Sequence, residues 1–273
     1  MLITTITLFK CSFAKITNSL LPRSINNVIG KRFIELLSVE STNNYAMRQV
    51  QKELAKNGDA YFAFEQTAGK GQFNKQWLSN KGENIILSIV LKTDELLINQ
   101  QFILNMVIAL GALKLFNKYS TEHAKIKWPN DIYWRDRKAA GILIENIIRG
   151  SSWQFAVIGI GMNINQVNFQ NDLKNPVSLK QITGKTYNVV DLAKELCDIL
   201  DQEVSRLFAG SNILILEAYN NGLYKLNENV SFKNSAGLFK GDIKKVNEAG
   251  ELIVETDQEE KAFKTGELEW MNG

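Results

Sequence analysis

The chain of 273 residues is long enough for one large domain, or for a large domain and a small one. Hydrophobic residues make up 45% and charged residues 22%, which is ordinary for a globular protein with a full core. The net charge of +3 excludes a strongly basic nucleic-acid-binding surface unless the cations cluster, and no apolar run reaches the roughly 18 residues of a membrane span. We therefore expect neither nucleic acid nor a membrane as a partner.

Cysteine and histidine usage excludes several kinds of site. Cys11 and Cys197 lie far apart and have no His or Cys neighbour at metal-ligand spacing. We therefore expect no disulfide framework, no metal held by a protein cluster, and a cytoplasmic location. The single histidine, His123, is expected on the surface. Residues 1–32 contain cations but no acid, and we interpret them as a leader of unknown role, with a transit-like segment as the alternative.

From residue 33 onward the sequence predicts alternating strands and helices. A helix is expected over 42–58, with Ser41 or Thr42 as its N-cap and Asn57-Gly58 as its end. The other expected elements are strands at 32–41, 60–66, 84–92 and 153–165, a strand–turn–strand unit at 124–147, and helices at 99–119, 189–209 and 211–223. The apolar strand at 84–92 is expected to be buried on both faces.

The character of the sequence changes after Leu226. Short alternating runs are split by Gly and Asn-Glu turns over roughly 45 residues, which is the pattern of a small all-β barrel. We therefore expect two domains, at 33–225 and 226–273.

The stretch FEQTAGKGQFNKQW at 64–77 combines glycines, cations and a tryptophan. Gly69 and Gly71 permit positive φ and a close approach of a ligand to the backbone, and successive N–H groups there would form an anion-binding concavity. Lys70 and Lys75 add positive charge for a phosphate or carboxylate, and Trp77 offers a flat apolar wall. A solvated hairpin loop with incidental lysines is the alternative.

The segment KIKWPNDIYWRDRKAAGILIE at 125–145 contains a second candidate site. Its proline is expected to force Trp128 into an extended conformation, and a tight turn at Asn130-Asp131 begins a hairpin that brings Asp131 and Lys138 together. Lys138 would there stabilise charge on a phosphoryl or carboxylate oxygen, while Asp131 would hold Mg²⁺ or orient a nucleophile. The alternative is an ordinary hairpin with a surface salt bridge, although the small residues after Lys138 favour a ligand.

The motif GIGMNIN at 159–165 ends a buried strand. Gly159 and Gly161 keep one face of that strand free of side chains, which suits a flat ligand, and Asn163 adds an amide. Taken alone, this pattern is common at strand ends.

The motif ESTNNYA at 40–46 opens a helix. Ser41, Thr42 and Asn43 place small hydrogen-bonding groups at the helix N-terminus, which suits a polar head group. A plain N-cap is the alternative.

These four motifs, in this order and at this spacing, resemble those of the biotin–protein ligases. The sequence STN is similar to the family's biotin motif, and QTAGKGQFNKQW to its Q-x-x-G-R-G-x-x-x-(R/K)-x-W adenylate loop. The segments KWPNDIYWRDRKAAGILIE and GIGMNIN are similar to the central signature and to the G-x-G-x-N-x-N strand. The C-terminal region resembles the family's small SH3-like domain, so that the resemblance covers most of the chain.

The resemblance implies an α/β (α+β) catalytic domain with a mixed β-sheet and helices on one side, followed by a small SH3-like β-barrel, and no N-terminal DNA-binding domain. The implied biotin-binding residues are Ser41, Thr42, Asn43, Gln66, Gly69, Lys70, Gly71, Gln72, Lys138, Gly141, Gly159 and Gly161. The implied adenylate- or ATP-binding residues are Lys70, Lys75, Trp77, Lys127, Asn130 and Asn163.

The implied reaction has two steps, with biotin, ATP and accompanying Mg²⁺. The biotin carboxylate attacks the α-phosphorus of ATP to give biotinyl-5′-AMP and pyrophosphate, and Lys138 would offset the repulsion between the two anions. A lysine of a biotin carboxyl carrier domain then takes the biotin and releases AMP, with Asp131 as the candidate that orients this lysine or accepts its proton. The resemblance is compatible with a monomer or a homodimer.

The sequence differs from the family pattern at two positions, and two other functions compete with this interpretation. Lys70 stands where the family usually has arginine, and Gln72 where some members have arginine, so weaker retention of the adenylate is expected. A lipoate–protein ligase is the nearest rival, but its arginine-rich, glycine-rich loop and nearby histidine are not seen here. A non-enzymatic biotin sensor is the other rival, and it would leave Lys138 unexplained.

Overall fold

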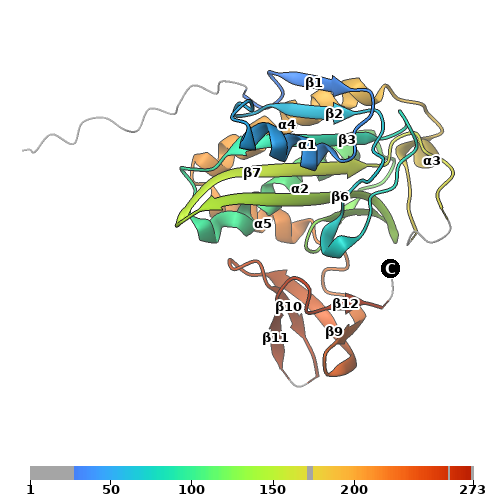
Figure 1. Cartoon of the computed structure of the whole chain (residues 1–273). Coiled ribbons are helices and arrows are strands. Elements are labelled where there is room, and N and C mark those ends of the chain that lie inside the picture. Colours follow the sequence, from blue (N-terminus) through green and yellow to red (C-terminus); the bar gives the residue numbers. More distant parts are fainter. Residues whose placement is uncertain (1–27, 171–174, 258, 272–273) are drawn as a thin grey trace, which may run out of the picture.

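The computed structural model describes residues 28–170, 175–257 and 259–271 (Figure 1). Most of the predicted leader, including Cys11, therefore lies outside the described residues. The last residues of that predicted segment pack against the large domain, because the backbone N–H groups of Val28 and Ile29 donate to Asp201 Oδ1 over 2.8 and 2.9 Å. The Gly30 N–H donates to the carbonyl of Gly58. The ordered chain of the large domain thus already includes residues 28–32.

A seven-stranded mixed sheet forms the centre of the large domain. Its strands are β1 (Phe33–Leu36), β2 (Ala60–Ala63), β3 (Ile85–Lys92), β4 (Lys125–Lys127), β5 (Asp131–Trp134), β6 (Arg137–Arg149) and β7 (Ser152–Met162), in the spatial order β1-β2-β3-β7-β6-β5-β4. β1 pairs in parallel with β2, and every other pair is antiparallel. The predicted mixed sheet is confirmed.

The helices of the large domain are α1 (Thr42–Gln51), α2 (Gln101–Tyr119), α3 (Leu179–Thr183), α4 (Val189–Phe208) and α5 (Asn212–Asn221). The prediction that α1 extends to Gly58 is wrong, because Glu53 adopts a left-handed conformation with φ of 57° directly after the helix. Such a conformation ends an α-helix, and no glycine at that position announces it in the sequence.

The two faces of the sheet are covered differently (Figure 1). Alternate strand residues such as Leu87, Ile158 and Ile160 face the layer of α2 and α4 and are fully or almost fully buried, and α5 packs on α2. On the opposite face α1 packs over β2, β3 and β7 through Ala46 and Val50. The expectation of helices on one side therefore holds for the long helices, whereas α1 covers part of the other face.

Helix α2 is the one described helix, taken with the turn before it as Ile98–Tyr119, that is long and apolar enough to cross a membrane. Of an apolar 18-residue stretch within it, 61% is buried inside the protein. Lys114 near its middle forms an ion pair with Glu203 on α4. Its apolar composition is therefore explained by its position in the core of the large domain.

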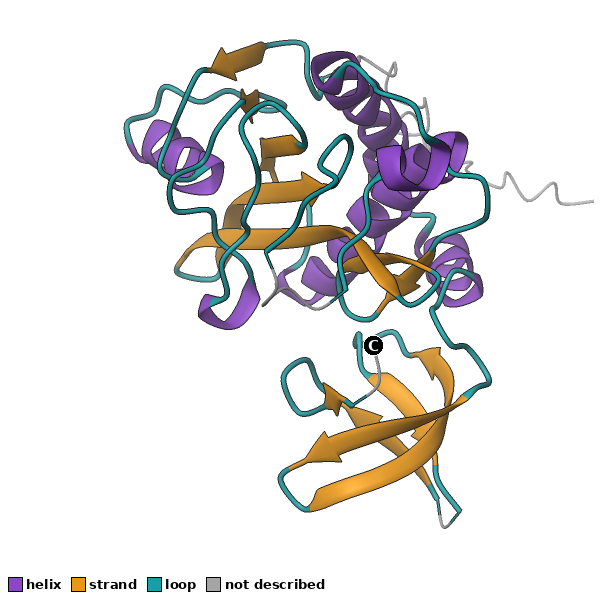
Figure 2. Ribbon diagram, turned by 90° about the vertical axis from the view of Figure 1, so that its right-hand side faces the viewer, coloured by secondary structure: helices purple, strands orange, loops and turns teal. Residues whose placement is uncertain are grey.

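Residues 229–270 form the small second domain (Figure 2). Its strands are β8 (Asn229–Asn234), β9 (Gly237–Val246), β10 (Leu252–Glu255), β11 (Glu260–Phe263) and β12 (Glu269–Trp270), in the antiparallel order β11-β10-β9-β8-β12. This sheet agrees with the predicted barrel. Hydrogen bonds join the small domain to the large one. The Trp128 indole N–H donates to the carbonyl of Gly250 over 3.0 Å, and the Asn220 side-chain amide bonds to the backbone N–H and carbonyl of Val246.

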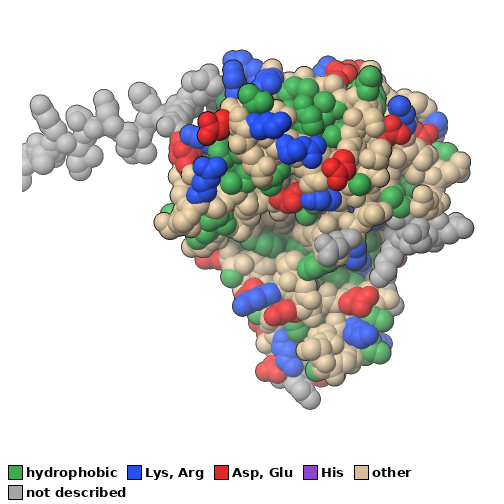
Figure 3. Space-filling view, in the orientation of Figure 1, with side chains coloured by type: hydrophobic (Ala, Val, Ile, Leu, Met, Phe, Trp, Pro, Cys, Tyr) green, Lys and Arg blue, Asp and Glu red, His purple; other side chains and the backbone are tan. Residues whose placement is uncertain are grey.

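On the face shown in Figure 3, positive and negative side chains are interspersed, and the surface narrows where the two domains meet. The 69–77 loop of the large domain reaches the small one near this junction. A side chain at Gly266 would come within 3.2 Å of the Phe73 ring.

Candidate active site

Three of the glycines predicted to line the ligand lie together on one face of two neighbouring strands, β6 and β7. Strand pairing sets Gly141 opposite Gly161, Leu143 opposite Gly159, and Gly159 opposite Ser88. Residues opposite one another in an antiparallel pair point to the same face. The face that carries α1 therefore contains a strip of sheet with almost no side chains of its own, which we call the glycine strip (Gly141, Gly159, Gly161).

Two side chains from elsewhere in the fold occupy the glycine strip. A Cβ atom at Gly159 would lie 2.4 Å from Asn43 Oδ1, and one at Gly161 would lie 2.2 Å from the Trp77 indole. The flat group lying on this strand is thus Trp77 itself. Its indole N–H is buried without a hydrogen-bond partner, and an unpaired buried donor of this kind is unusual enough to mark a place where a ligand acceptor would fit.

The predicted polar motif at 41–43 opens α1 beside the glycine strip. Ser41 is the N-cap, and its hydroxyl accepts from the backbone N–H of Asn44. The Thr42 backbone N–H donates to Gln66 Oε1 over 2.7 Å, and the Thr42 hydroxyl lies 3.0 Å from the same oxygen. Ser41, Thr42 and Asn43 are all at most 4% exposed. The structure therefore brings the predicted residues 41–43 and Gln66 into one cluster.

Two residues of this cluster were missed by the sequence analysis. Ser88 on β3 is fully buried, and its hydroxyl lies 2.7 Å from Thr42 Oγ1 and 2.6 Å from Asn43 Oδ1. Glu145 on β6 accepts from Asn43 Nδ2 over 2.8 Å. The sequence contains a feature that could have identified each of them: Ser88 is a polar residue within an apolar strand, and Glu145 is an acidic residue at the end of the apolar segment GILIE. A polar residue facing the core needs a partner.

The 69–77 loop folds as a small hairpin with the 3₁₀ turn Gln72–Asn74 at its tip. The Trp77 N–H donates to the Gly69 carbonyl over 3.0 Å, and the Gly71 N–H donates to the Lys75 carbonyl over 2.7 Å. A Cβ at Gly69 would lie 2.4 Å from the Trp77 carbonyl oxygen. Neither Gly69 nor Gly71 has a positive φ, so that part of the prediction is wrong. Gly69 is needed because the backbone packs closely, and the left-handed residue is Phe73, with φ of 53°.

The two cations of this loop, Lys70 and Lys75, are both exposed. Lys70 Nζ lies 3.8 Å from Glu145 Oε1. The loop residues 68–73, 75 and 76 line a groove of about 560 Å³ together with Leu143, Glu145 and Thr265 of the small domain. Gln72 lies in this lining. The volume of the groove and its charged and polar lining residues suit a charged substrate group.

Lys138 and Asp131 meet at one end of the glycine strip, as the sequence predicts. Lys138 Nζ donates to Asp131 Oδ2 over 2.7 Å, and the side chains are 31% and 23% exposed. The same ammonium lies 5.9 Å from the centre of a Trp77 ring. A Cβ at Gly141 would lie 3.4 Å from both the Asp131 carboxylate and the Lys138 side chain. An ammonium that is partly open to solvent is thus held beside the strip on which Trp77 lies.

Lys127 lies elsewhere, at the junction of the two domains. Its ammonium is 4.5 Å from the ring centre of Tyr133, 5.8 Å from that of Tyr224 and 4.9 Å from that of Trp270 in β12. Its predicted role in binding ATP therefore stays a prediction. What the structure shows is a cation among aromatic rings that joins β4 to the small domain. The Trp128–Pro129 peptide bond next to it is cis.

Asn130 and Asn163 are both buried and bonded within the protein. The Asn130 amide donates to the carbonyl of Ile142, whose N–H donates back to the Asn130 carbonyl over 3.1 Å. The Asn163 amide donates to the carbonyl of Lys138 over 3.3 Å. These asparagines fix the backbone around Lys138, and their predicted contact with ATP stays a prediction.

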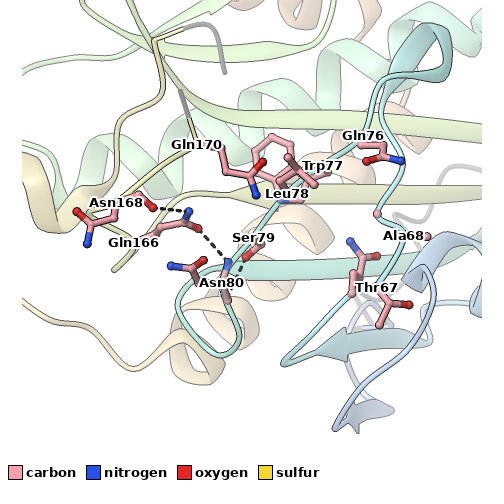
Figure 4. A pocket seen from close by; sticks show the side chains of 12 residues that line it. Thr67, Ala68, Gln76, Trp77, Leu78, Ser79, Asn80, Gln166, Asn168 and Gln170 are labelled. Atoms are coloured by element: carbon pink, nitrogen blue, oxygen red, sulfur yellow. Dashed lines mark hydrogen bonds between the residues drawn. The ribbon is translucent and has the colours of Figure 1, made fainter. Parts of the chain in front are cut away.

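A second hollow of about 120 Å³ lies behind the 69–77 loop (Figure 4). Gln166, one of the lining residues, is 4% exposed, and both atoms of its amide are bonded: the oxygen accepts from the Asn80 N–H and the Asn84 amide, and the nitrogen donates to the Asn168 carbonyl. Its walls also include Trp77 and Gln76. These bonds hold Asn80 and Asn84 in the segment between the loop and β3, so that the residues around this hollow support the loop.

Metal-ligating residues do not gather in the described part of the chain. Within residues 28–170, 175–257 and 259–271, no group of three His, Cys, Asp or Glu side chains could hold a metal ion. Among these described residues, Asp131 is the one acidic side chain that forms an ion pair with Lys138.

Comparison with known proteins finds similarity to one family of ligases. Residues 36–163 match the model of the biotin/lipoate A/B protein ligase family. The bifunctional ligase/repressor BirA of Escherichia coli is 35% identical over 130 residues, which are 46% of this chain and 38% of that protein. The BirA of Bacillus subtilis is 24% identical over 245 residues, which are 89% of this chain and 75% of that protein. The match to the Escherichia coli relative thus spans less than half of that protein's length.

A solved structure has the same fold. The biotin protein ligase from Aquifex aeolicus in complex with biotin and ATP superposes with a TM-score of 0.76, and the alignment covers 89% of this chain and all of the other. The two sequences are 23% identical. This likeness covers both domains and confirms the predicted fold class.

Proposed function

Because residues 36–163 match the model of the biotin/lipoate A/B protein ligase family, we propose that this protein is a biotin–protein ligase. It activates biotin with ATP to biotinyl-5′-AMP and transfers biotin to a lysine of a biotin carboxyl carrier domain. The structure with which it aligns over both domains is described as binding biotin and ATP. The observation that carries the proposal is the Lys138–Asp131 pair at one end of the glycine strip, with the polar cluster at 41–43 at the other.

In the first step, Lys138 brings two anions together. The biotin carboxylate and the α-phosphate repel each other, and an ammonium positioned between them stabilises the charge that builds up as the new P–O bond forms and pyrophosphate leaves. Lys138 is 31% exposed and is held in place by Asp131 over 2.7 Å. Asn163, which bonds to the Lys138 carbonyl, keeps the lysine backbone in position.

The 69–77 loop supplies the remaining charge and excludes water. Lys70 and Lys75 provide cations, Gly69 to Gln72 provide backbone at the groove, and Trp77 lies over the glycine strip. Closing such a loop over a mixed anhydride protects it from hydrolysis. Mg²⁺ arrives with the ATP phosphates as part of the substrate, and Asp131 is the candidate protein oxygen for it.

In the second step, the acceptor lysine attacks the carbonyl carbon of the anhydride and AMP leaves. The attacking amine must lose a proton, and the Asp131 carboxylate is the proposed group that orients it or accepts that proton. The cytoplasm is the proposed location, because the carrier domain and ATP must both be accessible.

The polar cluster favours biotin over lipoate. Thr42, Asn43 and Gln66 present amide and hydroxyl groups that match a cyclic urea, whereas a dithiolane ring has no hydrogen-bond donor. A non-enzymatic sensor would need the cluster but not the Lys138–Asp131 pair.

Pyrophosphate release from ATP tests the proposal, with biotin and lipoate supplied in parallel. We expect release with biotin and a fall of about 10²–10³-fold for Lys138→Ala, which is the loss typical when a group that stabilises developing charge is removed. The matched control is Lys92→Ala, because Lys92 also pairs with an aspartate, Asp94 over 3.0 Å, but at the end of β3. Release with lipoate instead, or with neither acid, would contradict the proposal.

A further inference from the structure

Lys138 lies where the regular pairing of the sheet ends. The pairing between β6 and β7 stops at Ala140 and Met162, so that Lys138 extends beyond the end of β7. On the other side of β6, the register of the pairing with β5 shifts between Ile132 and Tyr133, and Tyr133 is the partner of Lys138. The backbone of this lysine therefore needs another partner on the β7 side.

A short segment takes the place of β7 beside Lys138. The Lys138 N–H donates to the carbonyl of Asn175, and the Val177 N–H donates to the carbonyl of Lys138, each over 2.9 Å. These bonds form a parallel bridge between Lys138 and Pro176. We call residues 175–178 the strap. Both backbone groups of Lys138 are bonded to the strap, so that the position of the lysine depends on it.

The two ends of the strap are held by other parts of the protein. At its start, the Asn175 side-chain amide donates to the carbonyl of Asp136 over 3.1 Å. At its end, Ser178 is fully buried and caps α3, with Gln181 as the other member of a capping box. Between them, Pro176 has no N–H, so that its carbonyl is the one backbone group that it can offer to a partner.

The side chain of Arg137 bonds to this carbonyl. Its Nη2 atom donates to the Pro176 carbonyl over 2.6 Å and to Gln181 Oε1 over 3.0 Å. The ammonium of the next residue, Lys138, contacts Asp131 instead. The two neighbouring cations thus have separate partners: Lys138 faces the proposed site, and Arg137 holds the strap that bonds to the Lys138 backbone.

We propose that Arg137 is a positioning residue for the first step of the reaction. By joining the strap to β6 it fixes the backbone of Lys138, and so sets where the ammonium lies relative to the biotin carboxylate and the α-phosphate. The inference rests on the proposed function, because it needs Lys138 to stabilise the developing charge. Loss of Arg137 should therefore slow adenylation but change biotin binding little, because the polar cluster at 41–43 lies at the other end of the glycine strip.

Steady-state pyrophosphate release by the full-length protein, with biotin and ATP varied in turn, tests this inference. For Arg137→Ala we expect kcat to fall about tenfold, the loss typical of one hydrogen bond from a charged group, while KM for biotin stays within about twofold. Arg137→Lys keeps a donor for the Pro176 carbonyl but loses the planar fork, and should therefore lose less activity than Arg137→Ala.

Arg135→Ala is the matched control. Arg135 lies in the same hairpin, and its Nε atom donates to Glu122 over 3.0 Å. This variant should keep the wild-type kcat. Hydrogen exchange gives a second readout: in Arg137→Ala, peptides that contain Lys138 or Val177 should exchange faster, since these two N–H groups bond across the strap. Peptides of α2 should exchange as in the wild type.

A double-mutant cycle distinguishes action through Lys138 from direct action on a ligand. If Arg137 acts by positioning Lys138, then Arg137→Ala should have almost no further effect on kcat in a Lys138→Ala protein, because the group that it positions is already missing.

Several outcomes would overturn the inference. They are an unchanged kcat in Arg137→Ala, a higher KM for biotin at unchanged kcat, and an equal fall of kcat in Arg135→Ala. A tenfold loss that persists in the Lys138→Ala background would also overturn it, because Arg137 would then act independently of the lysine. A wild-type protein that releases no pyrophosphate with biotin would contradict the proposed function, and hydrogen exchange would still show whether the strap depends on Arg137.

Discussion

The two faces of the central sheet differ although the same strands form both. In β7, Ile158 and Ile160 face α2 and α4 and are at most 2% exposed, while Gly159 and Gly161, which alternate with them, face the proposed site. The first face is filled by its own side chains. The second is filled by side chains brought from α1 and from the 69–77 loop, which suggests that it can be rearranged around a ligand.

Along β7, the residues that stabilise the fold therefore alternate with the residues that face the proposed site. Side chains that alternate along a strand point to opposite faces, so substitutions one residue apart should have different consequences. The predictions that follow use this property, beginning with the largest effects.

On the site face, Gly161→Val should abolish most activity without unfolding the protein. The Trp77 ring would have to move, since even a Cβ would lie 2.2 Å from it, and misplacement of groups around a reacting centre by about 1 Å can cost roughly 10²-fold. Initial rates of pyrophosphate release and a melting curve measure the two properties. A rate near that of the wild type would show that the Trp77 position does not matter.

On the core face, Ile160→Ala should have the opposite effect. Removing a side chain that is 2% exposed leaves a cavity and should lower the free energy of unfolding by about 2–5 kcal/mol. The Michaelis constant for biotin should change little below the melting temperature. Urea unfolding gives the free energy, and a loss of biotin affinity at equal folding would contradict the separation of the two faces.

At the edge of the site, Lys70→Arg should lengthen retention of the adenylate by a few-fold. A guanidinium forms two parallel hydrogen bonds to a phosphate where an ammonium acts as a point charge. Release of preformed biotinyl-5′-AMP, followed by rapid filtration, measures the change. Equal release rates for both proteins would show that Lys70 does not limit retention.

In the core layer, Cys197 on α4 should be almost unreactive in the folded protein. Burial raises the pKa of its thiol from 9.0 to about 12, and only the thiolate reacts. Because the folded protein holds this proton more tightly than the unfolded chain, its contribution to stability should decline as the pH rises above 9.0. Alkylation at pH 8, read by peptide mapping, should label Cys197 only after denaturation.

Much of the fold and the site could be predicted from the sequence because it depends on local patterns. The apolar strand at β3, the pairing of Lys138 with Asp131 across a short hairpin, and the helix start at Ser41 all follow from neighbouring residues. The glycine motif likewise predicts a strand face without side chains. Its occupants, however, come from distant parts of the chain.

What could not be predicted depends on contacts between distant segments. Ser88 and Glu145 join the site because β3 and β6 both lie beside β7, which no local pattern specifies. Lys127 is placed among aromatic rings because Trp270 of the small domain packs there. The early end of α1 depends on the left-handed Glu53, a residue with no particular preference for that conformation.

Native mass spectrometry after incubation with biotin, ATP and Mg²⁺ tests the central claim most directly, because it weighs whatever the glycine strip retains. The account predicts a noncovalent complex with the mass of biotinyl-5′-AMP for the wild type and for Ile160→Ala, and its loss for Lys138→Ala. A retained lipoyl-AMP when lipoate replaces biotin, or no retained adenylate with either acid, would contradict it.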